Sequence, residues 1–272
     1  MSNKQNKINV NYFRKKKADK EKIIALTAYD APTAKFAEEA GVELILVGDS
    51  LGMAVLGYET TVPVTIEQSL HHCKAVANAA KKAFIVGDMP FMTYQISAEQ
   101  AMTNAARYLQ EGGVNAVKIE GGKDMASTVE RLVNAGVPVM GHIGLLPQKV
   151  LTSGGYKIAG KNEDETTRLI EDAKALEAAG IFSLVLECMP AEVAKEISEA
   201  VSIPTIGIGG GVDCDGQIQV VNDILGLFTE FLPRHARRYA HLGEEIKKAF
   251  SSYVSDVSNK QFPADEESFF KK

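Results

Sequence analysis

Five short apolar runs decide the fold of this chain, and each of them ends on an acidic or imidazole side chain. The runs are Leu44-Ile-Leu-Val-Gly-Asp49, Phe84-Ile-Val-Gly-Asp88, Val117-Lys-Ile-Glu120, Val139-Met-Gly-His142 and Leu184-Val-Leu-Glu187. Near-continuous runs of Val, Ile and Leu are typical of strands that are buried on both faces of a parallel sheet. Because an α/β barrel builds its active site at the carboxyl ends of its strands, the five endings together predict such a site.

The composition is that of an ordinary globular protein. The chain has 272 residues, of which 45% are hydrophobic and 24% are charged, and this length suits one large α/β domain or two small ones. The formal net charge of −5 argues against a nucleic-acid partner, which would require a basic face. The three cysteines form no CxxC pair, which indicates a reducing compartment and makes zinc unexpected.

No segment has the pattern of a membrane or secretion signal. No apolar run approaches the roughly 18 residues of a membrane helix, and no apolar segment follows the N-terminal charges as in a signal peptide. We therefore expect a cytoplasmic protein with no membrane partner. The basic cluster between Arg14 and Lys22 is interpreted as a solvated helix or arm before the first strand.

Strand and helix patterns alternate along the chain. The predicted strands are Ile23–Ala28, Leu44–Gly48, Phe84–Gly87, Ala116–Glu120, Val137–His142, Ser183–Glu187, Pro204–Ile208 and Gly216–Val221. About eight strand–helix repeats without a break in composition predict an α/β fold, a (β/α)8 TIM barrel. An open doubly wound sheet is the alternative, but polar endings on many strands favour the barrel.

The barrel is expected to form a single domain over residues 1–272, because no linker-like composition divides the chain. It is preceded by a short N-terminal helical arm, and the C-terminus is expected to be frayed from about Lys260. Two segments, Leu51–Val64 and Leu145–Asn162, are predicted to be loops. The second is long enough to indicate a functional role.

Asp49 and Asp88 are candidate ligands of a hard cation. Each follows a glycine at a strand end, and Mg²⁺ prefers one or two carboxylates together with substrate oxygens and water. The alternative is that they cap helices or loops. Ser50 can donate a hydrogen bond to a substrate carboxylate, or it is a turn residue.

Lys118 and Glu120 lie two positions apart on one strand, so their side chains share a face. Two charges that faced the helix layer would be costly to bury, so the interior mouth of the barrel is the better place. There Lys118 is a fixed cation and Glu120 is a ligand or holds a water molecule. A structural ion pair is the alternative.

Glu187 and His142 end two further strands. Glu187 follows a wholly apolar run and suits general-base work, although a salt-bridged interior acid has the same pattern. His142 either lines the site or is a core histidine whose hydrogen bonds are satisfied. The run Gly207-Ile-Gly-Gly-Gly211 follows the seventh strand, where barrels often bind phosphate; a tight turn, or a backbone that a flat ring approaches, is equally compatible.

Taken together, these stretches resemble ketopantoate hydroxymethyltransferase, also called 3-methyl-2-oxobutanoate hydroxymethyltransferase. The resemblance runs in order from about residue 8 to 240. The matching stretches are Leu26-Thr-Ala-Tyr-Asp30, Val47-Gly-Asp-Ser-Leu-Gly52, Thr61-Val-Pro-Val-Thr65, Val86-Gly-Asp-Met-Pro-Phe91, Val117-Lys-Ile-Glu-Gly-Gly122, Met140-Gly-His-Ile-Gly-Leu145, Leu186-Glu187 and Pro204-Thr-Ile-Gly-Ile-Gly209.

The resemblance implies a reaction and a metal. A hydroxymethyl group would pass from 5,10-methylenetetrahydrofolate to 3-methyl-2-oxobutanoate through a Mg²⁺-stabilised enolate, giving 2-dehydropantoate in the first step of pantothenate biosynthesis. Asp49 and Asp88 match the metal ligands, and Glu120 matches a further ligand, direct or through water.

The resemblance also implies residues that hold the substrate. Ser50, Asp88 and Lys118 match groups that bind the 2-oxo acid, with Asp49 as part of the same site. His142 matches a residue of the site wall, and Glu187 matches the proton acceptor. The family further implies a homo-oligomer, often a decamer.

Two other functions are weighed against this one. A Mg²⁺-dependent carbon–carbon lyase or mutase of the isocitrate-lyase kind also stabilises enolates, but its Lys-Lys-Cys-Gly-His stretch is absent. A non-catalytic barrel that binds a phosphorylated metabolite through Gly207–Gly211 is expected to lack the acid set, which is present here.

Overall fold

The computed structural model describes residues 8–229 and 231–271 and divides the chain into two compact units. The first unit ends at Val220, and the second begins at Val221. Every candidate site residue predicted above lies in the first unit, which contains the barrel.

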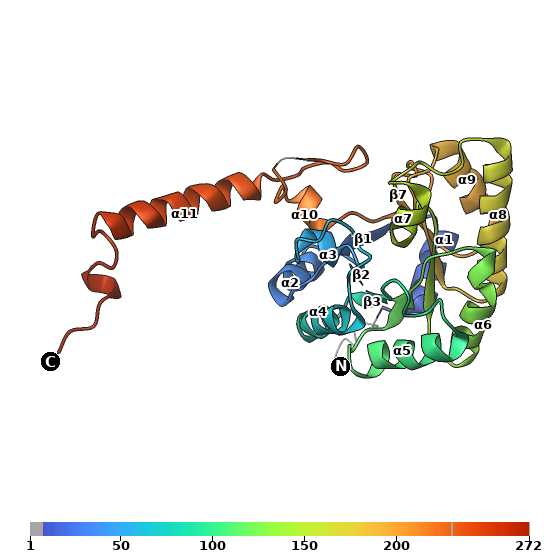
Figure 1. Ribbon diagram of the computed structural model, residues 1–272, viewed down its shortest axis with the longest axis horizontal. Helices are drawn as coiled ribbons and strands as arrows, with labels where there is room; N and C mark the ends of the chain where they lie inside the picture. The colour runs from blue at the N-terminus through green and yellow to red at the C-terminus, as the bar shows by residue number, and fades with distance from the viewer. Residues whose placement is uncertain (1–7, 230, 272) are drawn as a thin grey trace. The chain divides into compact units, whose positions relative to one another are not determined.

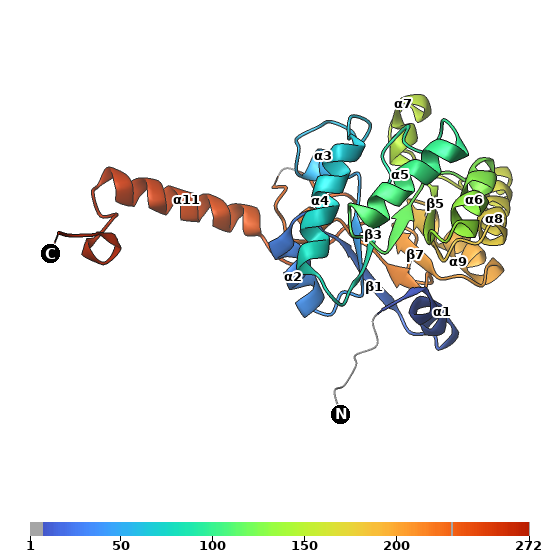
Figure 2. The same cartoon turned by 90° about the horizontal axis from the view of Figure 1, so that it is seen from below.

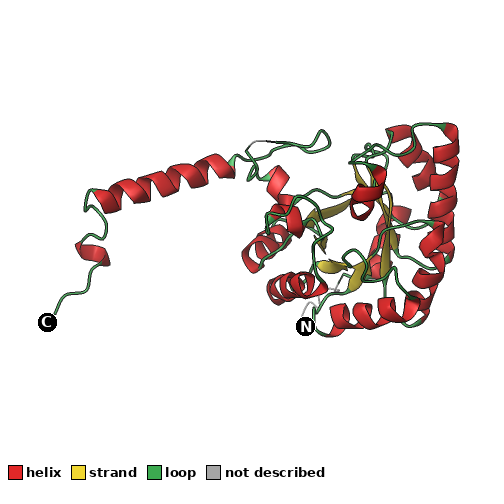
Figure 3. Cartoon of the chain, in the orientation of Figure 1, coloured by secondary structure: helices red, strands yellow, loops and turns green. Residues whose placement is uncertain are grey.

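Eight parallel strands close into a barrel, and helices surround it (Figures 1 and 3). Each strand pairs with its neighbours in sequence, and the last strand closes the ring by pairing with the first. The predicted (β/α)8 barrel is therefore confirmed. The strands are β1 (Ile23–Thr27), β2 (Leu44–Val47), β3 (Phe84–Asp88), β4 (Ala116–Lys118), β5 (Val139–Gly144), β6 (Ser183–Glu187), β7 (Thr205–Ile208) and β8 (Gly216–Gln217).

The longer helices of the barrel unit begin where the sequence offers capping residues. In five of them the N-cap side chain accepts a hydrogen bond from the backbone N–H three residues later, at Asn9, Asp30, Thr65, Ser97 and Asn162. No helix in the described part of the chain is long and apolar enough to span a membrane. The longer helices are α1 (Val10–Ala18), α2 (Ala31–Glu39), α4 (Ile66–Ala79), α5 (Ala98–Gln110), α6 (Ala126–Asn134), α8 (Glu163–Ala178) and α9 (Ala191–Ala200).

The two predicted loops contain short helices, so that prediction was wrong in part. The segment 51–64 begins with α3 (Leu51–Ala54), and the segment 145–162 contains η2 (Pro147–Lys149) and α7 (Val150–Ser153). A further short helix, η1 (Lys123–Met125), precedes α6. Elements of three or four residues do not complete the periodic pattern by which helices are recognised in sequence.

Side chains along the strands alternate between the barrel interior and the helix layer. The interior cluster includes Val86, Ala116, Met140 and Val185. The residues two positions later face the same way, and they are Asp88, Lys118, His142 and Glu187. The strands therefore direct an apolar layer and then a polar layer into the same barrel.

The basic N-terminal segment forms a helix before the first strand, as expected, but it is only partly solvated. Figure 2 shows α1 at the lower edge of the barrel, near β1 and β7. Phe13 of α1 is buried and packs edge-on against Phe84, at the amino end of β3, with ring centroids 5.3 Å apart. Lys17 Nζ donates to the carbonyls of Ser198 and Ile203 and pairs with Asp215, each at 2.9 Å. The helix therefore closes this end of the barrel.

The second unit contains α10 (Val221–Ile224), α11 (Leu242–Ser258) and the short η3 (Asp265–Glu267). The residues from Lys260, expected to be frayed, thus include a turn of 3₁₀ helix. One face of α11 exposes a stripe of large apolar side chains, which are Leu242, Ile246, Phe250, Tyr253, Val254 and Val257.

Candidate active site

The carboxyl ends of β2, β3 and β4 bring two of the predicted acids and a lysine into direct contact. The backbone N–H of Asp49 donates to Asp88 Oδ2 at 3.0 Å, and Lys118 Nζ donates to Asp88 Oδ1 at 2.7 Å. All three side chains are buried. Asp88 is thus fixed from both sides by hydrogen bonds before any ligand is considered.

The glycine before each aspartate is required by close packing. A Cβ atom on Gly87 would lie 2.4 Å from the ring of Tyr108, and one on Gly48 would lie 2.8 Å from Ser50 Oγ. Tyr108 also donates its hydroxyl to the backbone carbonyl of Asp88 at 2.7 Å. The repeated Val-Gly-Asp sequence therefore lets neighbouring side chains approach the strand ends closely.

Glu120 and His142 extend the cluster toward Glu187. Glu120 Oε1 lies 3.6 Å from both Lys118 Nζ and His142 Nδ1, and it makes no hydrogen bond to a described residue. His142 Nε2 lies 3.2 Å from Glu187 Oε2 without the angle of a hydrogen bond. Burial lowers the pKa of His142, but the two glutamates outweigh burial and raise it to about 9. The imidazole is therefore held protonated between two acids.

The cluster contains more buried acid than the lysine alone can neutralise. Burial raises the pKa of Asp49 well above its usual value, and repulsion from Asp88 and Glu120 adds to this. Burial likewise raises the pKa of Asp88, although Lys118 opposes the shift. The pKa of Lys118 itself is raised despite burial, because carboxylates surround it. A further cation at this point would relieve the repulsion.

The donor set fits a hard divalent cation. Asp49, Asp88 and Glu120 supply oxygen atoms only, and Glu120 Oε1 is a buried acceptor without a hydrogen bond. Within residues 8–229 and 231–271, no group of three or more His, Cys, Asp or Glu side chains is already arranged as a metal site. Mg²⁺ does not require such a cage, since it is usually bound by one or two carboxylates, substrate oxygens and water.

Ser50 and Glu187 lie at the edges of the cluster. Ser50 Oγ is 2.8 Å from the hydroxyl of Tyr29, and Ser50 makes no capping hydrogen bond to α3, so its hydroxyl is not used to begin that helix. The side chain of Glu187 is 16% exposed, whereas that of His142 is 2% exposed. Of these two side chains, Glu187 is therefore the one that a bound molecule can reach.

The glycine run after β7 packs as a tight turn. A Cβ atom on Gly211 would lie 2.5 Å from Ala191 Cβ, and one on Gly210 would lie 3.2 Å from Ala194 Cβ. Gln217 Nε2 donates to the carbonyl of Gly211 at 2.8 Å. Close approach to α9 therefore explains these glycines, and the phosphate-binding interpretation gains no support from them.

A sequence profile of one family, described as ketopantoate hydroxymethyltransferase, matches residues 7–265 of the chain. The chain belongs to this family. The resemblance stated from the sequence is therefore confirmed, and the family assignment makes the chain an enzyme.

Relatives of the ketopantoate hydroxymethyltransferase family match the chain along almost its whole length. A 3-methyl-2-oxobutanoate hydroxymethyltransferase of Dehalococcoides mccartyi is 55% identical over 260 residues, which are 96% of this chain and 92% of the relative. One from Carboxydothermus hydrogenoformans is 53% identical over 263 residues, which are 97% and 95% of the two chains.

Solved structures of other enzymes share the fold at low sequence identity. A phosphonopyruvate hydrolase in complex with oxalate and Mg²⁺ has a TM-score of 0.63 at 11% identity, covering 97% of this chain and 92% of the other. A 2,3-dimethylmalate lyase of the PEP mutase/isocitrate lyase superfamily has a TM-score of 0.58 at 15% identity, covering 96% and 91%. These likenesses concern the fold alone. The lyase or mutase alternative is not favoured, because the close sequence relatives are hydroxymethyltransferases.

Gln148 and Tyr94 belong to the polar cluster but were missed in the sequence. Gln148 Nε2 donates to Asp49 Oδ2 at 3.0 Å, and its backbone N–H donates to Glu120 Oε2 at 3.1 Å. The hydroxyl of Tyr94 donates to Gln148 Oε1 at 2.8 Å. Both residues are buried, Tyr94 in an irregular segment and Gln148 in the short η2, and neither segment has a periodic pattern that would mark them.

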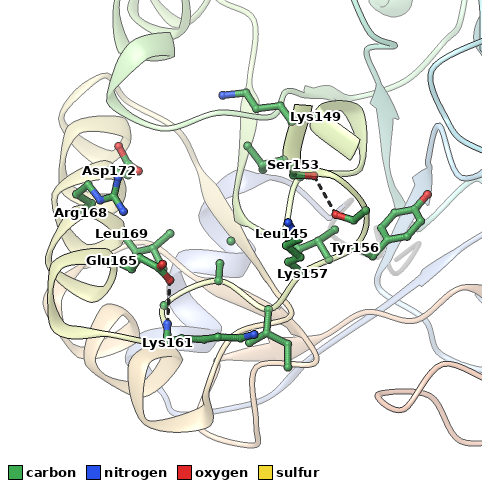
Figure 4. Close-up of a pocket in the computed structure, with 16 residues that line it drawn as sticks. Leu145, Lys149, Ser153, Tyr156, Lys157, Lys161, Glu165, Arg168, Leu169 and Asp172 are labelled. Carbon is green, nitrogen blue, oxygen red and sulfur yellow. Dashed lines mark hydrogen bonds between the residues drawn. The ribbon is translucent and has the colours of Figure 1, made fainter. Parts of the chain in front are cut away.

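A cavity of about 520 Å³ lies beside the carboxylate cluster described above, between the connection that follows β5 and helix α8. Gly144, which lines it, pairs in register with Glu187, and the backbone N–H of Leu145 donates to the carbonyl of Glu187 at 2.9 Å. Figure 4 shows one group of residues on the helix side, Arg168, Leu169 and Asp172, and another on the opposite wall, Lys149, Ser153 and Tyr156.

Proposed function

We propose that the chain transfers a hydroxymethyl group from 5,10-methylenetetrahydrofolate to 3-methyl-2-oxobutanoate, giving 2-dehydropantoate in the first step of pantothenate biosynthesis. The observation that carries the proposal is the buried cluster of Asp49, Asp88 and Glu120 around Lys118, at the mouth of a barrel of this family. The reaction removes the proton from C3 of the 2-oxo acid, forms a carbon–carbon bond there and consumes water, which provides the hydroxyl oxygen.

Asp49 and Asp88 are the residues that would hold Mg²⁺, with Glu120 as a further ligand, direct or through water. Bound there, the cation would supply Lewis-acid stabilisation of negative charge on the keto oxygen. The excess of buried carboxylate and the acceptor of Glu120 that lacks a hydrogen bond support this assignment.

The remaining residues of the chain bind the substrate and move its proton. Lys118, held by Asp88 at 2.7 Å, provides a fixed positive charge for the carboxylate of the 2-oxo acid. Ser50 offers a hydroxyl to the same substrate. Glu187 takes the proton from C3, and His142, whose Nε2 lies 3.2 Å from Glu187 Oε2, is part of the site wall.

The proposal is tested by NMR of 3-methyl-2-oxobutanoate in D2O with the enzyme and Mg²⁺, first without and then with 5,10-methylenetetrahydrofolate. We expect the C3 proton signal to disappear in the first step and 2-dehydropantoate to accumulate in the second. A folded protein that gives neither exchange nor product would overturn the proposed reaction.

The role of Glu187 is tested by Glu187→Gln. The substitution keeps the shape of the side chain but removes its basicity, so exchange should slow by about 10²–10⁴-fold, the usual contribution of a general base. Binding of the 2-oxo acid in the presence of Mg²⁺ should remain. Exchange at the wild-type rate would contradict the assignment of Glu187 as the base.

The predicted homo-oligomer, which the family implies as a decamer, stays a prediction, as does the cytoplasmic location. The apolar stripe on α11, from Leu242 to Val257, is a surface that an assembly would cover and so supports it. Light scattering coupled to size-exclusion chromatography should give a mass that is a multiple of 29.4 kDa. A monomer at micromolar concentration would contradict it.

A further inference from the structure

The cavity beside the carboxylate cluster has an excess of positive charge. Four cations line it, Lys149, Lys157, Lys161 and Arg168, against two acids, Glu165 and Asp172. The chain as a whole has a net charge of −5, so a local excess of cations runs against the general balance. This local excess favours an anionic ligand.

The two acids of the cavity each accept a hydrogen bond from a backbone N–H. Glu165 Oε2 accepts the backbone N–H of Lys161 at 3.0 Å, at the start of α8. Asp172 Oδ1 accepts the backbone N–H of Lys123 at 2.8 Å and so holds the segment that begins η1. Each acid therefore has at least one oxygen that the fold uses, and the four cations still outnumber the two acids on the cavity wall.

Three of the four cations remain available. Lys149 Nζ lies 3.5 Å from Asp124, whereas the side chains of Lys157, Lys161 and Arg168 form no ion pair with any residue in the described ranges. Figure 4 shows Lys157 near the middle of the view, Lys161 below it and Arg168 on the helix side. The charged end of the cavity is therefore set by α8 and the segment before it.

The other end of the cavity is more apolar and lies beside the predicted site. Leu145 and Ile158 line it together with the half-exposed ring of Tyr156. The hydroxyl of Tyr156 lies 3.5 Å from Met53 Sδ, in the helix that follows Ser50, and the backbone N–H of Leu145 donates to the carbonyl of Glu187 at 2.9 Å. One continuous cavity thus joins a flat apolar surface near Glu187 to a cationic end on α8.

We propose that this cavity binds the p-aminobenzoyl-glutamate part of the folate co-substrate. The inference rests on the proposed function and assigns the site of its second substrate. The glutamate carboxylates pair with Lys161 and Arg168, since a planar guanidinium can bind a carboxylate through two hydrogen bonds. The aromatic part lies along Tyr156 and Leu145, which directs the one-carbon unit toward the atom that Glu187 deprotonates.

Two physical requirements support this orientation. Near the strand ends the only buried cation is Lys118, which the 2-oxo acid uses in the proposed reaction, so the glutamate tail is expected at the cationic wall of the cavity. The volume of about 520 Å³ falls within the range of roughly 300–1,000 Å³ found for small-molecule pockets. The cavity meets both requirements.

The test compares two ligands that differ only in the tail, tetrahydrofolate and tetrahydropteroate, which lacks the glutamate. Dissociation constants are measured by calorimetry with Mg²⁺ and 3-methyl-2-oxobutanoate present, for the wild type and for the double variant Lys161→Gln/Arg168→Gln. The wild type should bind tetrahydrofolate more tightly than tetrahydropteroate by about tenfold or more, and the double variant should lose this preference.

The matched control is Lys174→Gln, which removes an exposed cation from α8 outside the cavity and should keep the wild-type preference. If the double variant also keeps it, the cavity is not the site of the tail, and the proposed function stands when wild-type C3 exchange is observed. A wild type that shows neither exchange nor folate binding overturns the proposed function and this inference with it.

Discussion

The two ends of the barrel are built from the same strands but satisfy their side chains differently. At the amino end, Phe13 packs against Phe84, and Lys17 donates to three acceptors, each at 2.9 Å. At the carboxyl end, Glu120 Oε1 and both ring nitrogens of His142 are buried without a hydrogen bond to a described residue. At the amino end the side chains are packed and hydrogen-bonded, whereas at the carboxyl end several buried polar atoms have no hydrogen bond.

The difference separates stability from chemistry within one barrel. Buried polar atoms that lack partners cost free energy and are rare unless they serve a purpose. In this fold the active site lies at the carboxyl ends of the strands, and the opposite end contributes mainly to stability. Substitutions at the amino end should therefore change the free energy of unfolding, and substitutions at the carboxyl end should change binding and turnover.

The largest effect is expected at the amino end, for Phe13→Ala. The change removes a fully buried ring that touches Phe84 and Phe182, so it should lower the free energy of unfolding by about 3–5 kcal/mol. Denaturant titration measures this loss, and turnover per folded molecule should be unchanged. Arg14→Ala, on the exposed side of α1, is the control and should stay within about 0.5 kcal/mol of the wild type. Equal losses in both variants would show that α1 does not close the barrel.

At the carboxyl end, Asp88→Asn should have the opposite profile. Loss of an outer-shell partner commonly weakens metal binding by about 10–100-fold, so loss of a proposed ligand should weaken Mg²⁺-dependent binding of the 2-oxo acid by about a hundredfold or more. The free energy of unfolding should change less than for Phe13→Ala, because one of three crowded carboxylates is neutralised. A Mg²⁺ titration identical to that of the wild type would remove Asp88 from the metal site.

The parts of the site that could be predicted from sequence are those that depend on strand periodicity. Asp49, Asp88 and Glu187 each follow a run of buried apolar residues, and such a run places its last side chain at the mouth of a parallel barrel. The boundary of β4 was less predictable. It ends at Lys118 and not at Glu120, because the backbone N–H of Glu120 donates to the hydroxyl of Tyr94.

The parts that could not be predicted depend on contacts between distant segments. Gln148 lies 99 positions from Asp49 in sequence, yet the two side chains are hydrogen-bonded. Nothing in the residues around Gln148 shows this, since the pairing arises only when the segment after β5 folds over the barrel mouth. The closure of the amino end by Phe13 could not be predicted either. Helix α1 is mostly polar, and its one buried residue forms no periodic pattern.

Gln148→Leu tests whether this segment positions the carboxylates. The substitution keeps the approximate size of the side chain but removes the hydrogen bonds to Asp49 and Tyr94, so Asp49 loses its orientation. We expect the Mg²⁺ affinity to fall by about 10–100-fold, as for other outer-shell partners. Gln95→Leu, which removes a longer bond of 3.2 Å to the same Gln148 Oε1, is the matched control and should have a smaller effect. If both variants bind Mg²⁺ like the wild type, the segment has no positioning role.

The smallest effect is expected for Lys17→Met, at the amino end of the barrel. Lys17 is a charged residue at the stable end, but its three acceptors use its hydrogen-bonding capacity fully, so the charge serves the fold. Methionine keeps the length of the stem and loses these bonds, which should cost about 1–2 kcal/mol of unfolding free energy. Lys15→Met removes an exposed i,i+4 pair with Asp19 and should cost at most about 0.5 kcal/mol. Turnover should be unaffected in both variants. If Lys17→Met slowed turnover without lowering stability, charge at the amino end would act on the chemistry, and the division between the two ends of the barrel would not hold.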